Sequence, residues 1–293
     1  MTEPHRIVVG YDGSDFSMQA LAWAMDEAEF RGLPLTVTHA WRWPYGEADD
    51  EAKLHLRKAA EHVLYHGANC ARACSAITDV AADLYEGSAV QRLAELSADA
   101  ELVVVGSRGL GAAARSVVGS VTASVVAVAC CPAVVVRGAG PIPVSPHPGP
   151  VALGVRDTTA DQVLDFAFHE AALRRLRLRV LHAGHPRSLT WGVAMTHLPD
   201  LDDSTRACQE WLTERLAPWQ EKYAGVPVDV RFTTNAPKET LRAASIGATV
   251  IVVGSGRTAH RTGRSGAIIR SLVRHSSCPV AVVPSASDEL HDL

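Results

Sequence analysis

The chain contains an internal repeat that spans nearly its whole length. The first half holds the strings IVVGYD, TVTHAW, LVVVGS and CCPAVVV, and the second half holds VALGVR, RVLHAG, VIVVGS and SCPVAVV in the same order. Four landmark pairs recur with offsets of 143 to 148 residues, and these are Gly10 with Gly154, His39 with His182, Gly106 with Gly254, and Pro132 with Pro279. Offsets this steady are hard to produce by chance, so the chain is predicted to be two copies of one domain.

The chain length and a segment rich in glycine and proline indicate where the two copies meet. The chain has 293 residues, which at roughly 100 to 200 residues per domain favours two domains over one. Between the copies lies GAGPIPVSPHPGP, residues 138–150, where glycine and proline dominate and neither a strand nor a helix period is visible. We therefore predict a first domain over residues 1–138, a linker over 139–149 and a second domain over 150–293.

Each copy alternates short Val, Ile and Leu runs with longer stretches of helical period, the pattern of a parallel sheet with helices on both faces. In the first half we predict strands at 6–10, 35–41, 76–84, 101–106 and 133–137, and helices at 15–31, 50–73, 88–98 and 119–129. In the second half we predict strands near 150–155, 177–182, 227–233, 249–254 and 279–283. The predicted fold class is α/β, with two tandem five-stranded, parallel, doubly wound domains.

Composition and charge exclude several classes of function. A formal net charge of −4 with 20% charged residues gives no basic excess, so nucleic acid and anionic membrane surfaces are poor partners. No apolar stretch of signal-peptide length precedes Tyr11, which favours a cytoplasmic location. Residues 116–136 carry no charge, but Gly119 and Pro132 interrupt them. We predict a buried helix and a buried strand there, rather than a membrane span.

Metal-binding and catalytic patterns are not found in the sequence. The cysteine pairs Cys70 with Cys74 and Cys130 with Cys131 are interpreted as small buried hydrophobes, because no partner follows at the spacing of a metal site. A lysine-bearing Walker loop and a G-x-S-x-G nucleophile elbow are both absent. His39 and its counterpart in the second half are interpreted as structural histidines rather than general bases. No catalytic residue and no metal ligand is therefore predicted.

The loop after the fourth predicted strand is the strongest candidate for a binding site. In an open α/β sheet, ligands bind outside the carboxyl ends of the strands, where the strand order reverses. Gly106 and Gly109 let backbone N–H groups in this loop converge without side-chain clash, as in an anion-binding nest. Gly119 and Ser120 then begin a helix whose N-terminal amides and dipole attract phosphate. We predict a phosphate site over residues 106–120.

The spacing of this loop is similar to that of a known family. The pattern G-x-x-G, nine residues, then G followed by Ser or Thr resembles the ATP-binding signature of the universal stress protein family, and Gly106, Gly109, Gly119 and Ser120 match it without gaps. The likeness covers both halves. It implies Rossmann-like domains of the adenine nucleotide alpha-hydrolase-like type, with ATP as the ligand and Mg²⁺ as its candidate counterion. It also implies a stress-response role in which nucleotide changes domain packing or the choice of partner.

The resemblance assigns further contact residues one by one. They are Gly10, Tyr11, Asp12, Ala40, Arg108 and Val121. In the family, adenine and ribose lie over the ends of the first two strands, so Asp12 resembles the acidic residue near the nucleoside and Ala40 the backbone contact to adenine. Asp12 has the alternative role of capping the helix that follows it. Arg115 lies inside the nine-residue stretch and is interpreted as a solvated loop residue.

The second half departs from this signature. Its loop reads Gly-Ser-Gly at 254–256, nine residues, then Gly-Ala at 266–267, so one residue is missing and alanine replaces the hydroxyl. Arg156 stands where Asp12 stands in the first half, unless a shifted register brings in Asp157. We therefore predict that nucleotide binds mainly in the first half. The same loop carries a group of basic residues interpreted as solvated, and these are Arg257, His260, Arg261 and Arg264.

Two functions of different class remain open. The first is an ATP-binding regulatory protein with at most slow ATP hydrolysis or autophosphorylation, and the second is a nucleotide-free module for dimerisation or interaction. Cyclic AMP is a further candidate ligand, because it demands fewer phosphate contacts. Residues 133–137 and 280–283 are apolar and form edge strands in the resembled fold, where open backbone groups invite pairing. This favours an intramolecular pseudo-dimer, with a homodimer as a further candidate assembly.

Overall fold

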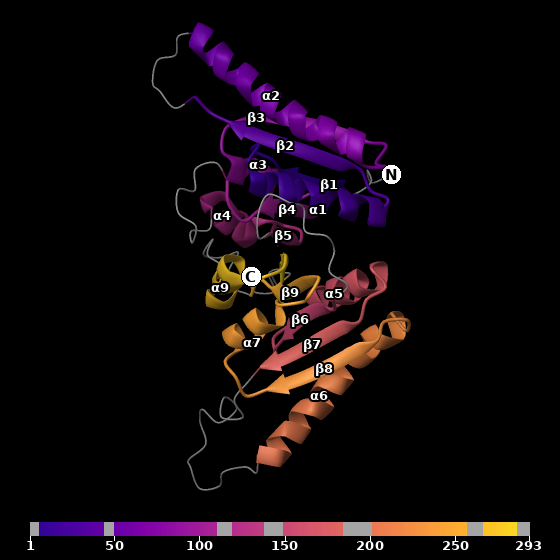
Figure 1. Ribbon diagram of the computed structural model, residues 1–293. Helices are drawn as coiled ribbons and strands as arrows, with labels where there is room; N and C mark the ends of the chain where they lie inside the picture. The colour runs from indigo at the N-terminus through magenta and orange to yellow at the C-terminus, as the bar shows by residue number, and fades with distance from the viewer. Residues whose placement is uncertain are drawn as a thin grey trace, which may run out of the picture.

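Alternating strands and helices run through the described part of the chain (Figure 1). The computed structural model describes residues 6–43, 50–109, 119–137, 149–183, 201–256 and 266–285, without the side chains of 201–205. Nearly all of the predicted linker lies outside these residues, and so do Arg115 and the four basic residues of the second-half loop. The boundaries given above for the two domains stay a prediction.

The two halves repeat the same order of elements. The first half consists of β1 (Arg6–Gly10), α1 (Asp15–Arg31), β2 (Leu35–Trp41), α2 (Asp50–Cys74), β3 (Val80–Glu86), α3 (Ala89–Leu96), β4 (Ala100–Gly106), α4 (Ser120–Val128) and β5 (Ala133–Val136). The second half consists of β6 (Val151–Val155), α5 (Asp161–Leu173), β7 (Leu178–Ala183), α6 (Leu201–Lys222), β8 (Val228–Thr233), α7 (Pro237–Ala244), β9 (Val250–Gly254), α9 (Ala267–His275) and β10 (Val280–Val283). The buried helix and strand predicted within residues 116–136 correspond to α4 and β5.

The strands of both halves form one continuous sheet. Its order is β3-β2-β1-β4-β5-β10-β9-β6-β7-β8, so each half contributes five strands in the same doubly wound order. Pairing is parallel within each half. At the centre, β5 pairs antiparallel with β10, with Val135 opposite Val280 and Ala133 opposite Val282. The predicted fold class is confirmed. The five strands of each half are joined into this one sheet through the fifth strand of each half.

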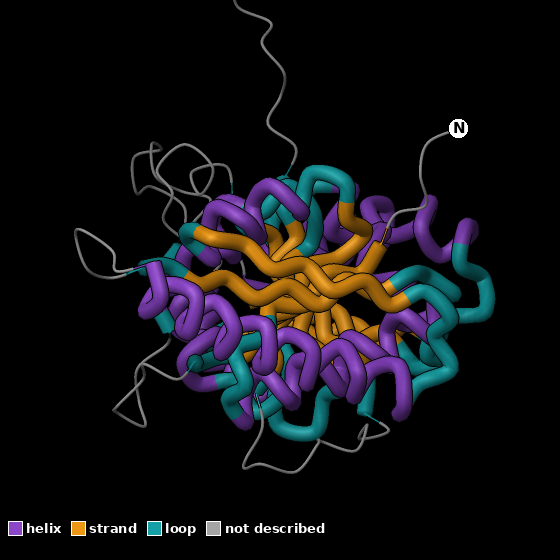
Figure 2. Tube along the Cα trace, turned by 90° about the horizontal axis from the view of Figure 1, so that it is seen from above, coloured by secondary structure: helices purple, strands orange, loops and turns teal. Residues whose placement is uncertain are grey.

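Helices cover both faces of this sheet (Figure 2). Successive β1 residues point to opposite faces, since Ile7 and Val9 belong to the buried cluster that includes residues of α1, α2, α5 and α6, whereas Val8 belongs to the cluster that includes residues of α3, α4, α7 and α9. Strands buried on both faces require apolar side chains at consecutive positions. The unbroken Val, Ile and Leu runs of the sequence follow from this requirement.

The third strand begins later than predicted. The sequence analysis placed it at 76–84, whereas β3 spans Val80–Glu86. Its extent is set by β2, because pairing starts with Leu35 opposite Val80. Ile77, which lies within the predicted range, is partly buried and packs on the core from the connection that precedes β3. An apolar residue can thus pack on the core without strand pairing.

The exposure of the cysteines differs from the prediction. Cys131 is buried, but Cys74 and Cys130 are exposed and Cys70 is half-buried. Cys74 is the last residue of α2 and Cys130 lies in the turn after α4, so neither faces the sheet. Among the described residues, no group of three or more His, Cys, Asp or Glu side chains is placed to hold a metal ion.

No described helix combines the length and the apolar character that crossing a bilayer requires.

Four charged side chains meet where α1 of the first half contacts α5 of the second half. Within each helix, Arg31 Nε lies 2.7 Å from Glu27 Oε1, and Arg174 Nη1 lies 2.7 Å from Glu170 Oε2. Each arginine also pairs with the glutamate of the other half. Burial would raise the pKa of Glu27, but the two guanidinium groups outweigh it and hold that pKa below its usual range. We call these four residues the interhalf charge cluster.

Candidate functional site

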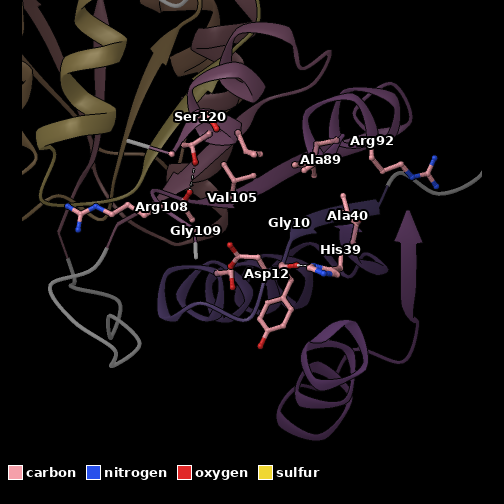
Figure 3. A pocket seen from close by; sticks show the side chains of 18 residues that line it. Gly10, Asp12, His39, Ala40, Ala89, Arg92, Val105, Arg108, Gly109 and Ser120 are labelled. Carbon is pink, nitrogen blue, oxygen red and sulfur yellow. Dashed lines mark hydrogen bonds between the residues drawn. The ribbon is translucent and has the colours of Figure 1, made fainter. Parts of the chain in front are cut away.

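A cavity of about 490 Å³ lies at the carboxyl ends of β1, β2 and β4 (Figure 3). All ten residues predicted as binding contacts line it, and they are Gly10, Tyr11, Asp12, Ala40, Gly106, Arg108, Gly109, Gly119, Ser120 and Val121. The cavity therefore brings together the turn after β1, the end of β2, the loop after β4 and the start of α4. These are the positions at which an open α/β sheet binds ligands.

The turn after β1 fixes the carboxylate of Asp12. Its Oδ1 accepts hydrogen bonds from Ser14 N at 3.0 Å and from Ser14 Oγ at 2.6 Å. Gly13 between them has φ +80°, a conformation that glycine adopts without strain. Ser14 itself is the N-cap of α1, since its Oγ accepts from Ser17 N. Ser14 is therefore the N-cap of α1, and Asp12 is not. Asp12 instead holds Ser14 in place through the two hydrogen bonds.

Tyr11 contributes its backbone to the cavity while its ring belongs to the core. The phenol oxygen lies 2.8 Å from His66 Nδ1 of α2, and a Cβ on Gly67 would come within 2.7 Å of the ring. Burial raises the pKa of this phenol. His39 Nδ1 donates to the Tyr11 carbonyl at 2.7 Å, which holds the imidazole at the cavity wall. This contact agrees with the structural role predicted for His39.

The glycines of the loop after β4 are required by close contacts, which differs from the predicted nest. Neither Gly106 nor Gly109 has a positive φ, the mark of left-handed backbone in such nests. A Cβ on Gly106 would lie 2.6 Å from the carbonyl oxygen of Phe16, so α1 approaches β4 closely here. A Cβ on Gly109 would lie 2.4 Å from Asp12 Oδ2. The absence of side chains lets the loop approach the turn after β1.

The N-terminus of α4 opens into the cavity. Gly119 is its N-cap and has no side chain to bond the first amides, and no acidic residue lies in the first turn. Gly119 N donates to Ser107 O at 3.1 Å, and Thr122 Oγ1 donates to Gly106 O at 2.7 Å, so the helix start is tied to β4. The first amides and the positive end of the helix dipole are therefore available to an anion.

A polar network on the wall of the cavity was missed by sequence reasoning. Arg92 of α3 binds Asp83 through both Nη2, at 2.6 Å, and Nε, at 3.0 Å, and Thr38 Oγ1 donates to the same carboxylate at 2.6 Å. Burial would raise the pKa of Asp83, but these hydrogen bonds hold it below its usual range. Figure 3 places Arg92 and Arg108 on opposite sides of the cavity. No periodic pattern links Thr38, Asp83 and Arg92, so only the fold brings them together.

Replacing Gly106 with alanine is expected to destabilise the protein by about 1 to 3 kcal/mol, because the added methyl group overlaps the backbone of Phe16. Chemical denaturation measures this change in the free energy of unfolding. The matched control is Gly225→Ala, since a Cβ there meets no atom within 4 Å. Equal stability of the two variants would show that α1 and β4 do not need this close approach.

The fold and the cavity together define a class: tandem, doubly wound α/β domains with a cavity at the carboxyl ends of the strands. The chain belongs to the universal stress protein family, because the profile of that family matches residues 4–137 and again residues 149–284. The family resemblance read from residues 106–120 is thereby confirmed.

Similar proteins extend over the full chain. The universal stress protein Rv2005c of Mycobacterium tuberculosis is 32% identical over 296 residues, covering 95% of this chain and 96% of its own. Universal stress protein Rv2623 of the same organism is 29% identical over 298 residues, covering 94% and 95%. Among solved structures, a universal stress protein from Archaeoglobus fulgidus superposes with a TM-score of 0.74 at 19% identity, covering 96% of this chain and 99% of its own. The tandem arrangement is thus shared with relatives.

Proposed function

We propose that the first-half cavity binds ATP, with the phosphates at the N-terminus of α4 and the adenine beside Ala40. The observation that carries this proposal is the opening of uncapped α4 amides into a cavity lined by all ten predicted contacts. Amides at a helix start bind phosphate through both hydrogen bonds and the helix dipole. In this arrangement Asp12 accepts hydrogen bonds from the ribose, and Mg²⁺ accompanies the phosphates as their counterion.

The protein binds nucleotide to regulate rather than to turn it over efficiently. Ser107 N donates to Val136 O at 3.0 Å, so the phosphate-binding loop is tied directly to the end of β5. β5 in turn pairs with β10 of the second half, and Arg137 Nη1 donates to Val273 O of α9 at 3.1 Å. Nucleotide binding in the cavity is therefore expected to change the packing at the junction of the two halves. We propose that pairing at this junction makes the two halves of the chain an intramolecular pseudo-dimer. The protein then acts in the cytoplasm, as part of the response to stress.

Titration calorimetry on the intact chain tests the proposal. ATP is expected to bind with a stoichiometry of one per chain, and AMP is expected to bind more weakly because it lacks two of the three phosphates. Cyclic AMP included in the same series separates a preference for cyclic nucleotide from one for ATP. Absence of saturable binding at millimolar ATP, or two equivalent sites per chain, would contradict the proposal.

Asp12→Asn is expected to weaken ATP binding about tenfold, because hydrogen bonds to a charged acceptor contribute about 1.5 to 3 kcal/mol. Asparagine keeps an oxygen that can accept from Ser14, so the cap of α1 is retained. Calorimetry measures the affinity, and thermal unfolding without nucleotide serves as the control for the fold. If the variant bound ATP as tightly as the original chain, the role of the carboxylate beside ribose would be wrong.

A further inference from the structure

A second cavity, of about 730 Å³, lies at the corresponding place in the second half. Its lining residues come mainly from β6, β7, β9, α7 and α9 and from the turns that follow β6 and β9. This volume lies within the range of about 300 to 1,000 Å³ that is usual for small-molecule sites. The second half therefore keeps a cavity although its glycine loop departs from the family signature.

Three hydroxyl-bearing residues that line the first cavity have apolar equivalents in the second. The second strands begin at Leu35 and Leu178, so Thr38 and Leu181 occupy equivalent positions. The helices α4 and α9 are both preceded by a glycine N-cap, which makes Ile269 the equivalent of Thr122. By the same match, alanine follows the glycine of α9 where serine follows that of α4. At these three positions a methyl group or an aliphatic chain has thus replaced a hydroxyl-bearing side chain, whereas Thr158, Thr159, Ser255 and Ser285 bring other hydroxyl-bearing side chains to the second cavity.

One charged position of the cavity has changed sign. Arg156 lines it at the position of Asp12, and the described residues that line the cavity include no Asp and no Glu. The guanidinium lies over the turn after β9, since its Nη2 is 3.5 Å from where a Cβ on Gly256 would stand. Among the residues that the structure describes, no carboxylate forms an ion pair with Arg156. The mouth of the cavity is cationic.

A helix N-terminus adds to this positive charge. Gly266, the N-cap of α9, has no side chain to bond the first amides, and the first turn of α9 contains no acidic residue. Ala267 and Ile268, which follow it, line the cavity. A guanidinium and free helix amides therefore lie beside aliphatic walls formed by Val155, Leu181, Leu241, Val253 and Ile269.

We propose that this second cavity binds an amphipathic monoanion, in which one carboxylate or phosphate head is joined to an aliphatic chain. The head pairs with Arg156 and the first amides of α9, and the chain lies along the aliphatic walls. A nucleoside is disfavoured there, because Arg156 stands where Asp12 would accept hydrogen bonds from ribose, and a guanidinium donates hydrogen bonds but accepts none. The aliphatic chain gains from the same walls, since its burial removes apolar surface from water.

Titration calorimetry with decanoate tests this inference on the intact chain in the presence of saturating ATP. One decanoate is expected to bind per chain. Arg156→Gln is expected to weaken binding about tenfold, and because Arg156 is exposed its replacement leaves the core intact. Ile268→Asp is a second variant that places a carboxylate at the helix start, where it favours the helix but repels the anionic head. The matched control is Arg177→Gln, which removes an exposed arginine just before β7 at the end of the sheet away from the cavity, and it is expected to leave decanoate binding unchanged.

Two further probes identify what the cavity recognises. Decyl phosphate compared with decanoate shows which anionic head is preferred, and binding of either supports the inference. Decanol carries the same chain without charge and is expected to bind at least about tenfold more weakly than decanoate. The inference is overturned if decanol binds as tightly as decanoate, if Arg156→Gln has no effect, or if AMP displaces decanoate. If ATP did not bind in the first half, the effect of Arg156→Gln and the comparison with decanol would still report on the second cavity, so the two proposals fail separately.

Discussion

Gly109→Asp is expected to lower the affinity for ATP by at least about 100-fold, or about 2.7 kcal/mol. Gly109 lies against the carboxylate of Asp12, where even a Cβ would come within 2.4 Å of Oδ2. An aspartate side chain at this position displaces Asp12 and adds negative charge beside the phosphates. Two unit charges 4 Å apart near a protein surface interact by about 4 kcal/mol, which is enough to account for the loss. Titration calorimetry with ATP measures it.

The control for this prediction is a second glycine replaced by the same residue. Gly225 is exposed, and a Cβ there meets no atom within 4 Å, so Gly225→Asp adds the same charge far from the cavity. This variant is expected to bind ATP as the original chain does. If Gly109→Asp bound ATP with unchanged affinity while remaining folded, the first-half cavity would not be the nucleotide site.

Arg174→Ala is expected to destabilise the protein by about 3 to 5 kcal/mol. Removing one partner from a buried ion pair leaves an uncompensated charge in an apolar surrounding. In the interhalf charge cluster, Arg174 pairs with both Glu170 and Glu27, and neither glutamate side chain is more than 1% exposed. The loss includes the contact between α1 and α5, so both halves are weakened. Chemical denaturation followed by circular dichroism measures the change.

An exposed ion pair in the same protein provides the comparison. Arg57 and Glu61 of α2 pair at 3.1 Å with side chains 60% and 36% exposed, so Arg57→Ala is expected to cost less than about 1 kcal/mol. Equal effects of Arg57→Ala and Arg174→Ala would show that the cluster does not hold the two halves together.

Much of the fold could be predicted from the sequence because the repeat constrains both halves at once. Apolar runs at matching offsets located nine of the ten strands closely, since a strand buried on both faces must be apolar at consecutive positions. The third strand was placed too early, because its pairing starts at Val80 and the partly buried Ile77 lies in the connection before it. Periodicity detects burial, and it does not detect which backbone groups are paired.

The candidate site was predicted as a set of residues better than as a geometry. The spacing of the motif identified the glycines, but it did not show why glycine is needed. A sequence does not reveal that Phe16 lies close to Gly106 and Asp12 close to Gly109. Arg92 was missed because its partner Asp83 lies on another element, and a contact between elements leaves no periodic trace. The interhalf charge cluster was not predicted, for a similar reason. Its Glu and Arg residues are spaced like an ordinary solvated pair on a helix, and only packing of the halves buries them.

A crystal structure of the intact chain with ATP tests the central claim most directly. The account predicts phosphate oxygens at about 2.7 to 3.2 Å from the backbone nitrogens of Ser120 and Val121, with adenine beside Ala40. ATP bound only in the second-half cavity, or phosphates that make no contact with the start of α4, would contradict it.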